Sequence, residues 1–183
     1  MSESDKISTA GPSGAMPHMG RTDCGDFAIH ISRDGTWWYR GSPIRRMPLV
    51  KLFASVLRRD DDGSYQLVTP AERGRITVED APFLAVELTV VGEGREQLLT
   101  FRTNLDDSVS AGEDHPIRVW TDEVTQGPNP YILVRPGLEA RLTRAVFYQL
   151  VESGREERVG QATLFGVWSQ GKFFPIGELG DTP

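Results

Sequence analysis

Apolar side chains recur along this chain with two different periods, which together predict a mixture of helices and strands. The clearest helical stripe follows the spacing i, i+3, i+4, i+7 and i+8 and consists of Leu49, Leu52, Phe53, Val56 and Leu57. The proline before this stripe suits the first helical position, where its missing N–H costs nothing. The spacing therefore predicts a helix that starts at this proline and ends before the turn Asp60–Gly63.

A second helix is predicted over residues 138–151. Its apolar side holds Leu142, Val146, Phe147, Leu150 and Val151. Gly154 follows at a position where glycine commonly caps the helix C-terminus.

Alternating apolar and polar residues predict strands before, between and after these helices. Phe27–Ile31 alternates, Asp34-Gly35 is a strong hairpin signal, and Trp37–Tyr39 forms the returning strand. In the middle of the chain Leu84 and every second residue to position 90 are apolar, which predicts one buried strand face. Further strands are predicted at residues 65–68, 76–78, 97–103, 117–120, 131–134, 161–168 and 172–176. The fold class is therefore α+β.

The two halves of the chain share a short pattern. Gly35-Thr36-Trp37 with Gly41 and Pro43-Ile44 has a counterpart in Gly166-Val167-Trp168 with Gly171 and Pro175-Ile176. Each half also has one amphipathic helix beside a tryptophan-bearing hairpin. The pattern leaves duplication and chance both open.

Composition and charge narrow the classes of function. The chain has 183 residues and a formal net charge of −6, and this acidic balance argues against nucleic acid as a partner. Its apolar runs are far shorter than the roughly 20 residues of a membrane helix. Residues 1–24 are polar, contain no secretory signal and are expected to form a disordered arm. The single cysteine, Cys24, fits a reducing cytoplasm.

The sequence holds no familiar catalytic or metal-binding motif, so catalytic residues, metal and cofactor are all predicted to be none. The histidines His18, His30 and His115 lie in the predicted arm, a strand and an acidic loop, without a nucleophile motif beside them. Asp60–Gly63 lacks the ligand spacing of a calcium loop. We therefore expect binding rather than catalysis.

Two polar segments are candidates for a binding site. Arg45 and Arg46 precede the first helix, where they are either solvated or, with the free N–H groups of that helix end, positioned to bind an anion. Glu79 and Asp80 form either a plain turn before Pro82 or part of a pocket where the chain crosses between two lobes. The aromatic residues Trp37, Trp120, Tyr131 and Trp168 are expected to pack in the core or in hairpins, with ligand stacking as the alternative.

A larger set of segments points to one family. These segments are Gly35–Trp37, Gly41–Ile44, Leu49–Phe53, Asp62–Pro70, Val78–Phe83, Phe101–Asn104, Pro130–Arg135, Val146–Val151 and Gly166–Gly171. Between Gly25 and Gly180 the chain resembles the uncharacterised bacterial family called domain of unknown function 1285. The resemblance implies a duplicated helix-plus-antiparallel-strand core in two small lobes. We place the N-terminal lobe at residues 25–80 and a β-rich, pleckstrin-homology-like C-terminal lobe at residues 81–183.

The resemblance also implies a small anionic, nucleotide-like ligand between the lobes and a regulatory role in signal transduction. The candidate ligand-binding residues are Arg45, Arg46, Glu79, Asp80, Asn104, Tyr131 and Arg135. One alternative function is a protein-interaction adaptor that docks a peptide along a sheet edge. Another is an enzyme that uses the carboxylates of Glu79 and Asp80.

Overall fold

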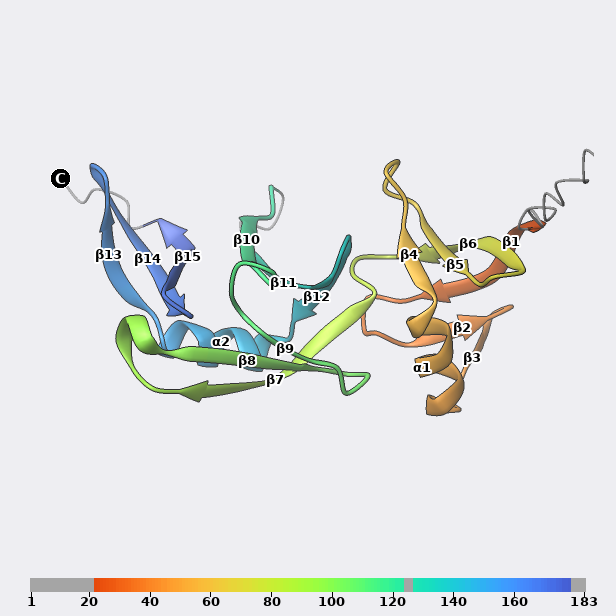
Figure 1. Ribbon diagram of the computed structural model, residues 1–183, viewed down its shortest axis with the longest axis horizontal. Coiled ribbons are helices and arrows are strands. Elements are labelled where there is room, and N and C mark those ends of the chain that lie inside the picture. The colour runs from red at the N-terminus through yellow and green to blue at the C-terminus, as the bar shows by residue number, and fades with distance from the viewer. Residues whose placement is uncertain (1–21, 124–126, 179–183) are drawn as a thin grey trace, which may run out of the picture.

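The computed structural model describes residues 22–123 and 127–178, which form two lobes placed end to end along the long axis of the molecule (Figure 1). Strands dominate both lobes, and each lobe contains one α-helix. We use "N-terminal lobe" for residues 22–81 and "C-terminal lobe" for residues 82–178. The two-lobed α+β arrangement expected from the sequence is thus present at this level of detail.

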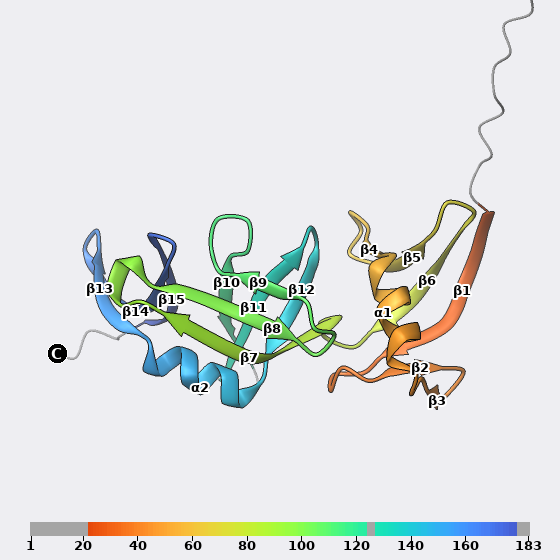
Figure 2. The same ribbon diagram turned by 60° about the horizontal axis from the view of Figure 1, so that its bottom comes forward.

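The N-terminal lobe is a curved six-stranded sheet with one helix. Its elements are β1 (Thr22–Ile31), β2 (Trp37–Tyr39), β3 (Ser42–Pro43), α1 (Met47–Ser55), β4 (Leu57–Arg59), β5 (Tyr65–Val68) and β6 (Glu72–Val78). The strand order is β3-β2-β1-β6-β5-β4, and only the β1/β6 pair is parallel. Helix α1 lies on the side of this sheet that faces the C-terminal lobe (Figures 1 and 2).

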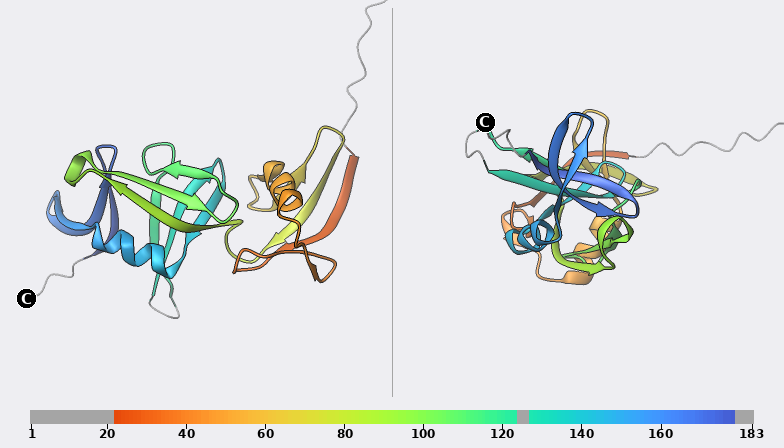
Figure 3. Two further views of the ribbon diagram at one scale, coloured as in Figure 1. Left: turned by 90° about the horizontal axis from the view of Figure 1, so that it is seen from below. Right: turned by 90° about the vertical axis from the view of Figure 1, so that its left-hand side faces the viewer.

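The C-terminal lobe combines a six-stranded sheet with a three-stranded one. Its elements are β7 (Phe83–Val91), β8 (Leu98–Thr103), β9 (Ser108–Ser110), β10 (Ile117–Thr121), β11 (Pro128–Arg135), β12 (Leu138–Leu142), α2 (Arg144–Glu152), β13 (Arg155–Val159), β14 (Ala162–Ser169) and β15 (Lys172–Glu178), with a 3-10 turn at Gly94–Glu96. The orders are β10-β11-β12-β7-β8-β9 and β13-β14-β15. Helix α2 packs against β7, and the end-on view shows how tightly the two sheets curl together (Figure 3).

The two helices are followed by the same succession of elements. Each helix has nine residues and leads into three consecutive antiparallel strands, β4-β5-β6 after α1 and β13-β14-β15 after α2. The sequence echo has another structural origin, because one of its hairpins precedes α1 and the other follows α2. What these hairpins share is a two-residue turn with positive φ at both positions, Arg40-Gly41 and Gln170-Gly171. This is the type I′ geometry favoured in tight hairpins.

The predicted second helix begins too early in the sequence. Residues 138–142 form β12, in which Leu138, Ala140 and Leu142 are buried in alternation. The helix starts after Thr143, whose hydroxyl accepts a hydrogen bond from the N–H of Val146. A threonine at this N-cap position stabilises a helix start by about 1 kcal/mol, so the alternation and the cap together place the boundary.

Three further expectations differ from the structure in detail. Helix α1 ends at Ser55, and Leu57 belongs to β4 rather than to the helical stripe. Val86 and Val90 are exposed, because Phe83 and Ala85 take the buried face at the start of β7 and the end of the strand, residues 89–91, is exposed. The predicted disordered arm, residues 1–24, lies outside the described residues as far as residue 21, whereas Thr22–Cys24 begin β1, in which Thr22 and Asp23 pair with β6.

Buried apolar side chains from both lobes belong to one hydrophobic cluster. Trp37 is only 2% exposed and stacks on Phe53 at 6.4 Å between ring centroids, so it packs in the core as expected. Trp120, by contrast, is 55% exposed on the sheet-edge strand β10. In the part of the chain that the structure describes, neither helix is long and apolar enough to cross a bilayer.

Candidate functional site

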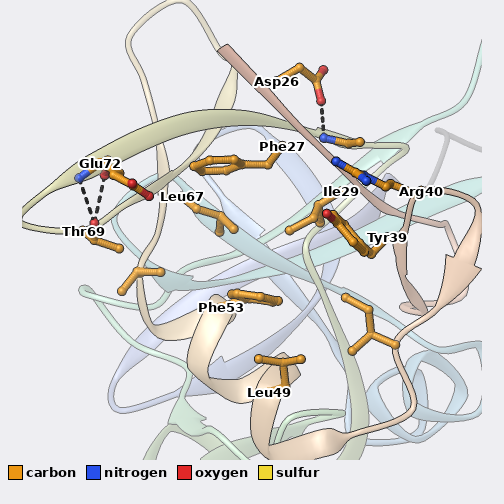
Figure 4. A pocket seen from close by; sticks show the side chains of 13 residues that line it. Asp26, Phe27, Ile29, Tyr39, Arg40, Leu49, Phe53, Leu67, Thr69 and Glu72 are labelled. Carbon is orange, nitrogen blue, oxygen red and sulfur yellow. Dashed lines mark hydrogen bonds between the residues drawn. The ribbon is translucent and has the colours of Figure 1, made fainter. Parts of the chain in front are cut away.

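A cavity lies inside the N-terminal lobe, between α1 and the curved sheet (Figure 4). Its volume is about 540 Å³, within the range of roughly 300–1,000 Å³ typical of small-molecule sites. Its walls are mostly apolar and include Phe27, Ile29, Ile44, Leu49, Phe53, Val56 and Leu67. Most of these side chains are only half-buried because they face the cavity.

A kink in β1 shapes one wall of this cavity. Ala28 has a φ of +53°, and the pairing of β1 with β6 is irregular between Asp26 and His30. A carboxylate oxygen of Asp26 accepts a hydrogen bond from the N–H of Ala28 at 2.5 Å, which holds the kink. A positive φ in a residue other than glycine costs of order 1 kcal/mol or more and often marks a functional site.

Arg40, on the same rim, shares this unusual conformation. Its φ is +47°, and its N–H donates to the carbonyl oxygen of Ala28 at 2.9 Å. Two of the four non-glycine residues with positive φ in the described chain therefore line this cavity and are bonded to each other. Backbone strain is concentrated where the cavity opens.

Glycine at position 74 makes room for the aromatic wall. A Cβ atom on Gly74 would lie 2.6–2.7 Å from the ring of Phe27, so only a glycine allows the ring to rest on β6. Any larger residue would push Phe27 toward the cavity. The shape of the cavity thus depends on a contact between β1 and β6 that has no local signal in the sequence.

A second group of functional candidates lies at the junction between the lobes. Asp80, with 13% of its side chain exposed, accepts a hydrogen bond from the Tyr131 hydroxyl at 2.7 Å and one from Arg141 at 3.2 Å. Arg33 approaches the same carboxylate at 3.7 Å. Burial, followed by the bond to Asp80, raises the pKa of Tyr131 to about 12. The Asp80 carboxylate therefore joins the segment between β6 and β7, which connects the lobes, to β11 and β12.

Glu79 is more exposed than its neighbour and binds the N-terminal lobe. It accepts from the backbone N–H of Arg33 at 2.8 Å and pairs with His30 at 2.7 Å. These contacts, the backbone bond first, lower the pKa of Glu79. Both the histidine and the carboxylate are about half-exposed, which is the geometry of a surface ion pair.

Asn104 and Arg135 of the C-terminal lobe contact the N-terminal lobe at two further points of the junction. The side-chain oxygen of Asn104 accepts from the N–H of Leu84 at 3.0 Å, and the amide group lies against Gly35 of the N-terminal lobe. Arg135 donates to the carbonyl oxygen of Ala54 in α1 at 2.8 Å and lies over the ring of Phe83. Burial lowers the pKa of Arg135.

The lobes also enclose a small cavity of about 120 Å³ beside Arg135, lined by Lys51, Ala54, Ser55, Leu105, Asp107 and Arg135. Lys51 in α1 pairs with Asp106 of the C-terminal lobe at 2.6 Å. This volume is well below that of a typical small-molecule site.

The structure therefore divides the seven predicted site residues. It brings Glu79, Asp80, Asn104, Tyr131 and Arg135 to the lobe junction, where each contacts protein groups. Arg45 and Arg46 are exposed before α1 and, within residues 22–123 and 127–178, make no side-chain hydrogen bond or ion pair with those five. Ligand binding by any of the seven stays a prediction.

The cavity in the N-terminal lobe was missed in the sequence. The apolar stripe of α1 predicts a buried helix face, but it does not distinguish a face that lines a cavity from one that packs in the core. The bulge at Ala28 and the space above Gly74 depend on pairing across the sheet. The turn at Arg40-Gly41 was the available clue, since an arginine is unusual where both residues need positive φ.

In the described part of the chain, no three histidine, cysteine or carboxylate side chains lie close enough together to bind a metal ion. His115 is used structurally, with Nδ1 bonded to the carbonyl oxygen of Leu133 at 2.9 Å. The groups that line the N-terminal cavity suit non-covalent binding.

Comparison with known proteins supports the family expected from the sequence. Residues 19–81 match the N-terminal domain of the family described as domain of unknown function (DUF1285), and residues 82–176 match its C-terminal domain. No curated protein matches this chain.

Two solved structures share the fold. A DUF1285 family protein from Silicibacter pomeroyi DSS-3 is 44% identical, with a TM-score of 0.80 over 92% of this chain and 91% of the other. One from Shewanella baltica OS155 is 29% identical, with a TM-score of 0.54 over 69% of this chain and 91% of the other. With both of its domains matched in order along the chain, this protein belongs to the DUF1285 family.

Proposed function

We propose that this protein is a regulatory module that binds a small, partly apolar ligand in the cavity of its N-terminal lobe. The observation that carries the proposal is the half-buried apolar wall, in which Phe27, Leu49 and Phe53 face about 540 Å³ of open space. Burying apolar surface is favourable by roughly 25 cal/mol per Å². A ligand that fills this space gains the contacts that the lobe itself leaves unmade.

The cavity is a better candidate for the ligand site than the lobe junction. The described junction cavity measures about 120 Å³ and is flanked by groups already engaged in contacts between the lobes. A nucleotide-like ligand between the lobes, as the family resemblance implies, would have to separate these contacts. We therefore place the ligand in the N-terminal lobe and keep the junction for a different role.

Helix α1 supplies the regulatory part of the proposal. One side of this helix lines the cavity through Leu49 and Phe53. Two other contacts of the helix reach the C-terminal lobe, through Lys51 to Asp106 and through the carbonyl oxygen of Ala54 to Arg135. Because the same helix touches both regions, a ligand that shifts α1 changes the contacts that hold the lobes together.

The finer likeness of the C-terminal lobe to a pleckstrin-homology fold belongs to the same proposal. Curled sheets with α2 packed on β7 support it. In a signalling role, such a lobe would bind a partner protein when the ligand is bound. The alternative adaptor function requires no small ligand.

Dye binding tests the proposal directly. Anilinonaphthalene sulfonate, an anionic apolar dye, should bind the folded protein at one site, with enhanced fluorescence. Leu49→Trp fills the cavity from a half-buried position and should abolish that binding. Leu52→Trp is the matched control, because Leu52 lies on the same helix, is 60% exposed and does not line the cavity.

Circular dichroism of both variants shows whether the fold is retained, because loosely packed states also bind the dye. Equal dye binding by folded Leu49→Trp and Leu52→Trp proteins would rule out this cavity. A thermal-shift screen of nucleotides covers the junction alternative, since a ligand at 100 times its Kd stabilises by about 2.7 kcal/mol.

A further inference from the structure

We infer that the ligand is an amphipathic anion, whose oxyanion head group binds Arg40 at the rim while its apolar tail fills the cavity. This inference rests on the proposed function and specifies the ligand class. It is carried by the position of Arg40, by the charges around the cavity and by the shape of the apolar wall, taken in turn below.

Arg40 occupies a position where its side chain is a poor fit to the backbone. It is the first residue of the Arg40-Gly41 turn between β2 and β3, and both residues have positive φ. Asparagine, aspartate and glycine are favoured at this turn position, whereas a long side chain gains nothing there. The turn geometry alone therefore does not account for an arginine at this position, which indicates that its side chain has another role.

The guanidinium of Arg40 is available for a ligand. It lies 5.2 Å from the centroid of the Tyr39 ring, which supports it from one side. Within the described ranges 22–123 and 127–178, no carboxylate lies within ion-pair distance of it. Among the thirteen residues that line the cavity Arg40 is the only cation. Its planar fork matches a carboxylate or phosphate in a bidentate manner.

The two acidic residues of the cavity wall lie at its two ends, Asp26 at the end of Arg40 and Glu72 at the other (Figure 4). Asp26 uses its carboxylate to hold the N–H of Ala28. Glu72 lies beside Thr69 at the opposite end of the cavity from Arg40 (Figure 4), in a turn where its N–H bonds to the threonine hydroxyl at 3.0 Å. The only cation of the cavity wall therefore lies at the end where the neighbouring carboxylate, Asp26, already accepts a backbone hydrogen bond.

The space between these ends suits a hydrocarbon tail. Phe27 and Leu67 of the sheet and Phe53 and Leu49 of α1 face this space from its two sides (Figure 4). Tyr39, 43% exposed, continues the apolar surface to the rim beside Arg40. An elongated molecule with one charged end would place its head group at Arg40 and its tail along this wall.

Titration calorimetry with four probes that share one alkyl chain tests this inference. The probes are decanoate, decyl phosphate, decanol and decylamine, each used below its micelle-forming concentration. We expect the protein to bind decanoate and decyl phosphate about fivefold more tightly than decanol, the gain of an exposed ion pair of about 1 kcal/mol. Decylamine should bind most weakly of the four.

Arg40→Asn is the informative variant, since asparagine suits the positive φ of this turn and the fold should be kept. It should remove the preference for decanoate over decanol and leave decanol binding unchanged. Arg158→Asn, which changes the same charge on an exposed residue of β13, should bind all four probes like the parent protein.

The outcomes separate the two claims. If decanol binds the parent protein as tightly as decanoate, or if decylamine binds most tightly, the anionic head group is wrong and the cavity proposal stands. If Arg40→Asn keeps the full preference for anions, another residue holds the head group. If none of the probes binds and the dye is not bound either, the proposed function itself fails.

Discussion

Arg135 of β11 donates a hydrogen bond to the carbonyl oxygen of Ala54 at the end of α1, at 2.8 Å, and so joins the C-terminal lobe to the one helix of the N-terminal lobe. A cation at a helix C-terminus is stabilised by the helix dipole. The guanidinium also covers the ring of Phe83, the first residue of β7. One side chain thus ties together α1, β7 and β11.

Replacing this residue should therefore weaken the whole molecule. We expect Arg135→Met to lower the free energy of unfolding by about 1–2 kcal/mol, because a charge-assisted hydrogen bond is lost while the apolar contact with Phe83 is kept. Urea denaturation followed by tryptophan fluorescence measures the change. Arg158→Met on the exposed strand β13 is the control and should be within experimental error of the parent protein. Equal stability of both variants would mean that the bond across the junction contributes nothing.

Alanine substitutions at two glycines distinguish the cost of backbone strain from the cost of a lost contact between the lobes. Gly35 and Gly41 have nearly the same φ, +79° and +78°, but a Cβ on Gly35 would lie 2.8 Å from the Asn104 amide and 3.1 Å from Leu84, whereas Gly41 has nothing within 4 Å. Gly41→Ala should cost about 1 kcal/mol from backbone strain alone. Gly35→Ala should cost about 1 kcal/mol more, because the side chains of Asn104 and Leu84 at the junction must also shift.

Thermal and urea unfolding of both glycine variants provide the measurement. Two equal losses would show that the close approach of Gly35 to Asn104 is relieved without effect on the junction. A larger loss for Gly41→Ala would contradict the account of both turns.

Acid should weaken the contact between Lys51 and Asp106. Lys51 first, and then Arg102, lower the pKa of the Asp106 carboxyl below its ordinary value of 3.8. Because the folded-state pKa is depressed, the stabilisation is complete above pH 3.8 and is lost as the pH falls through the lowered value. The stability gap between the parent protein and Asp106→Asn should therefore close in that acid range.

Urea denaturation of both proteins at neutral pH and again in that acid range checks this expectation. High salt should narrow the same gap at neutral pH, since both side chains are largely exposed. Asp61→Asn, in the exposed turn after β4, should show no such convergence with the parent protein. A gap that is constant with pH would mean that the Asp106 charge does not act through Lys51.

Secondary-structure elements whose start and end are set by a few neighbouring residues could be predicted from the sequence. The strand Tyr65–Val68 was predicted correctly because Asp62-Gly63 begins it and Pro70 closes it. The second helix was misplaced because Leu142 fits a helical stripe as well as a strand. The alternation of Leu138, Ala140 and Leu142, together with the Thr143 cap, separates the two.

The sites depend on contacts that no local pattern contains. Family resemblance identified five residues that do meet at the junction, although it could not show that each would already hold a protein partner there. The N-terminal cavity needs the kink at Ala28, the space above Gly74 and the turn at Arg40, and each of these acquires meaning only when β1, β2 and β6 are paired. Strain and close approach are properties of the assembled sheet.

The buried bond between Tyr131 and Asp80 should be visible in alkaline titration. The ordinary tyrosine pKa of 10.0 is raised to about 12 in Tyr131. For a group with a raised folded-state pKa, stabilisation is complete below the unfolded value and is lost as the pH rises through the folded one. Part of the folding free energy should therefore disappear between about pH 10 and 12.

Tyr131→Phe tests this assignment in two ways. Ultraviolet titration of phenolate should lose the step near pH 12 that the parent protein shows. At neutral pH the variant should unfold about 1–2 kcal/mol more easily, because Asp80 loses its hydroxyl donor. Tyr148→Phe is the control for stability, since Tyr148 is 58% exposed on α2. If the alkaline step persists in Tyr131→Phe, another tyrosine produces it, and the bond to Asp80 is weaker than its 2.7 Å length indicates.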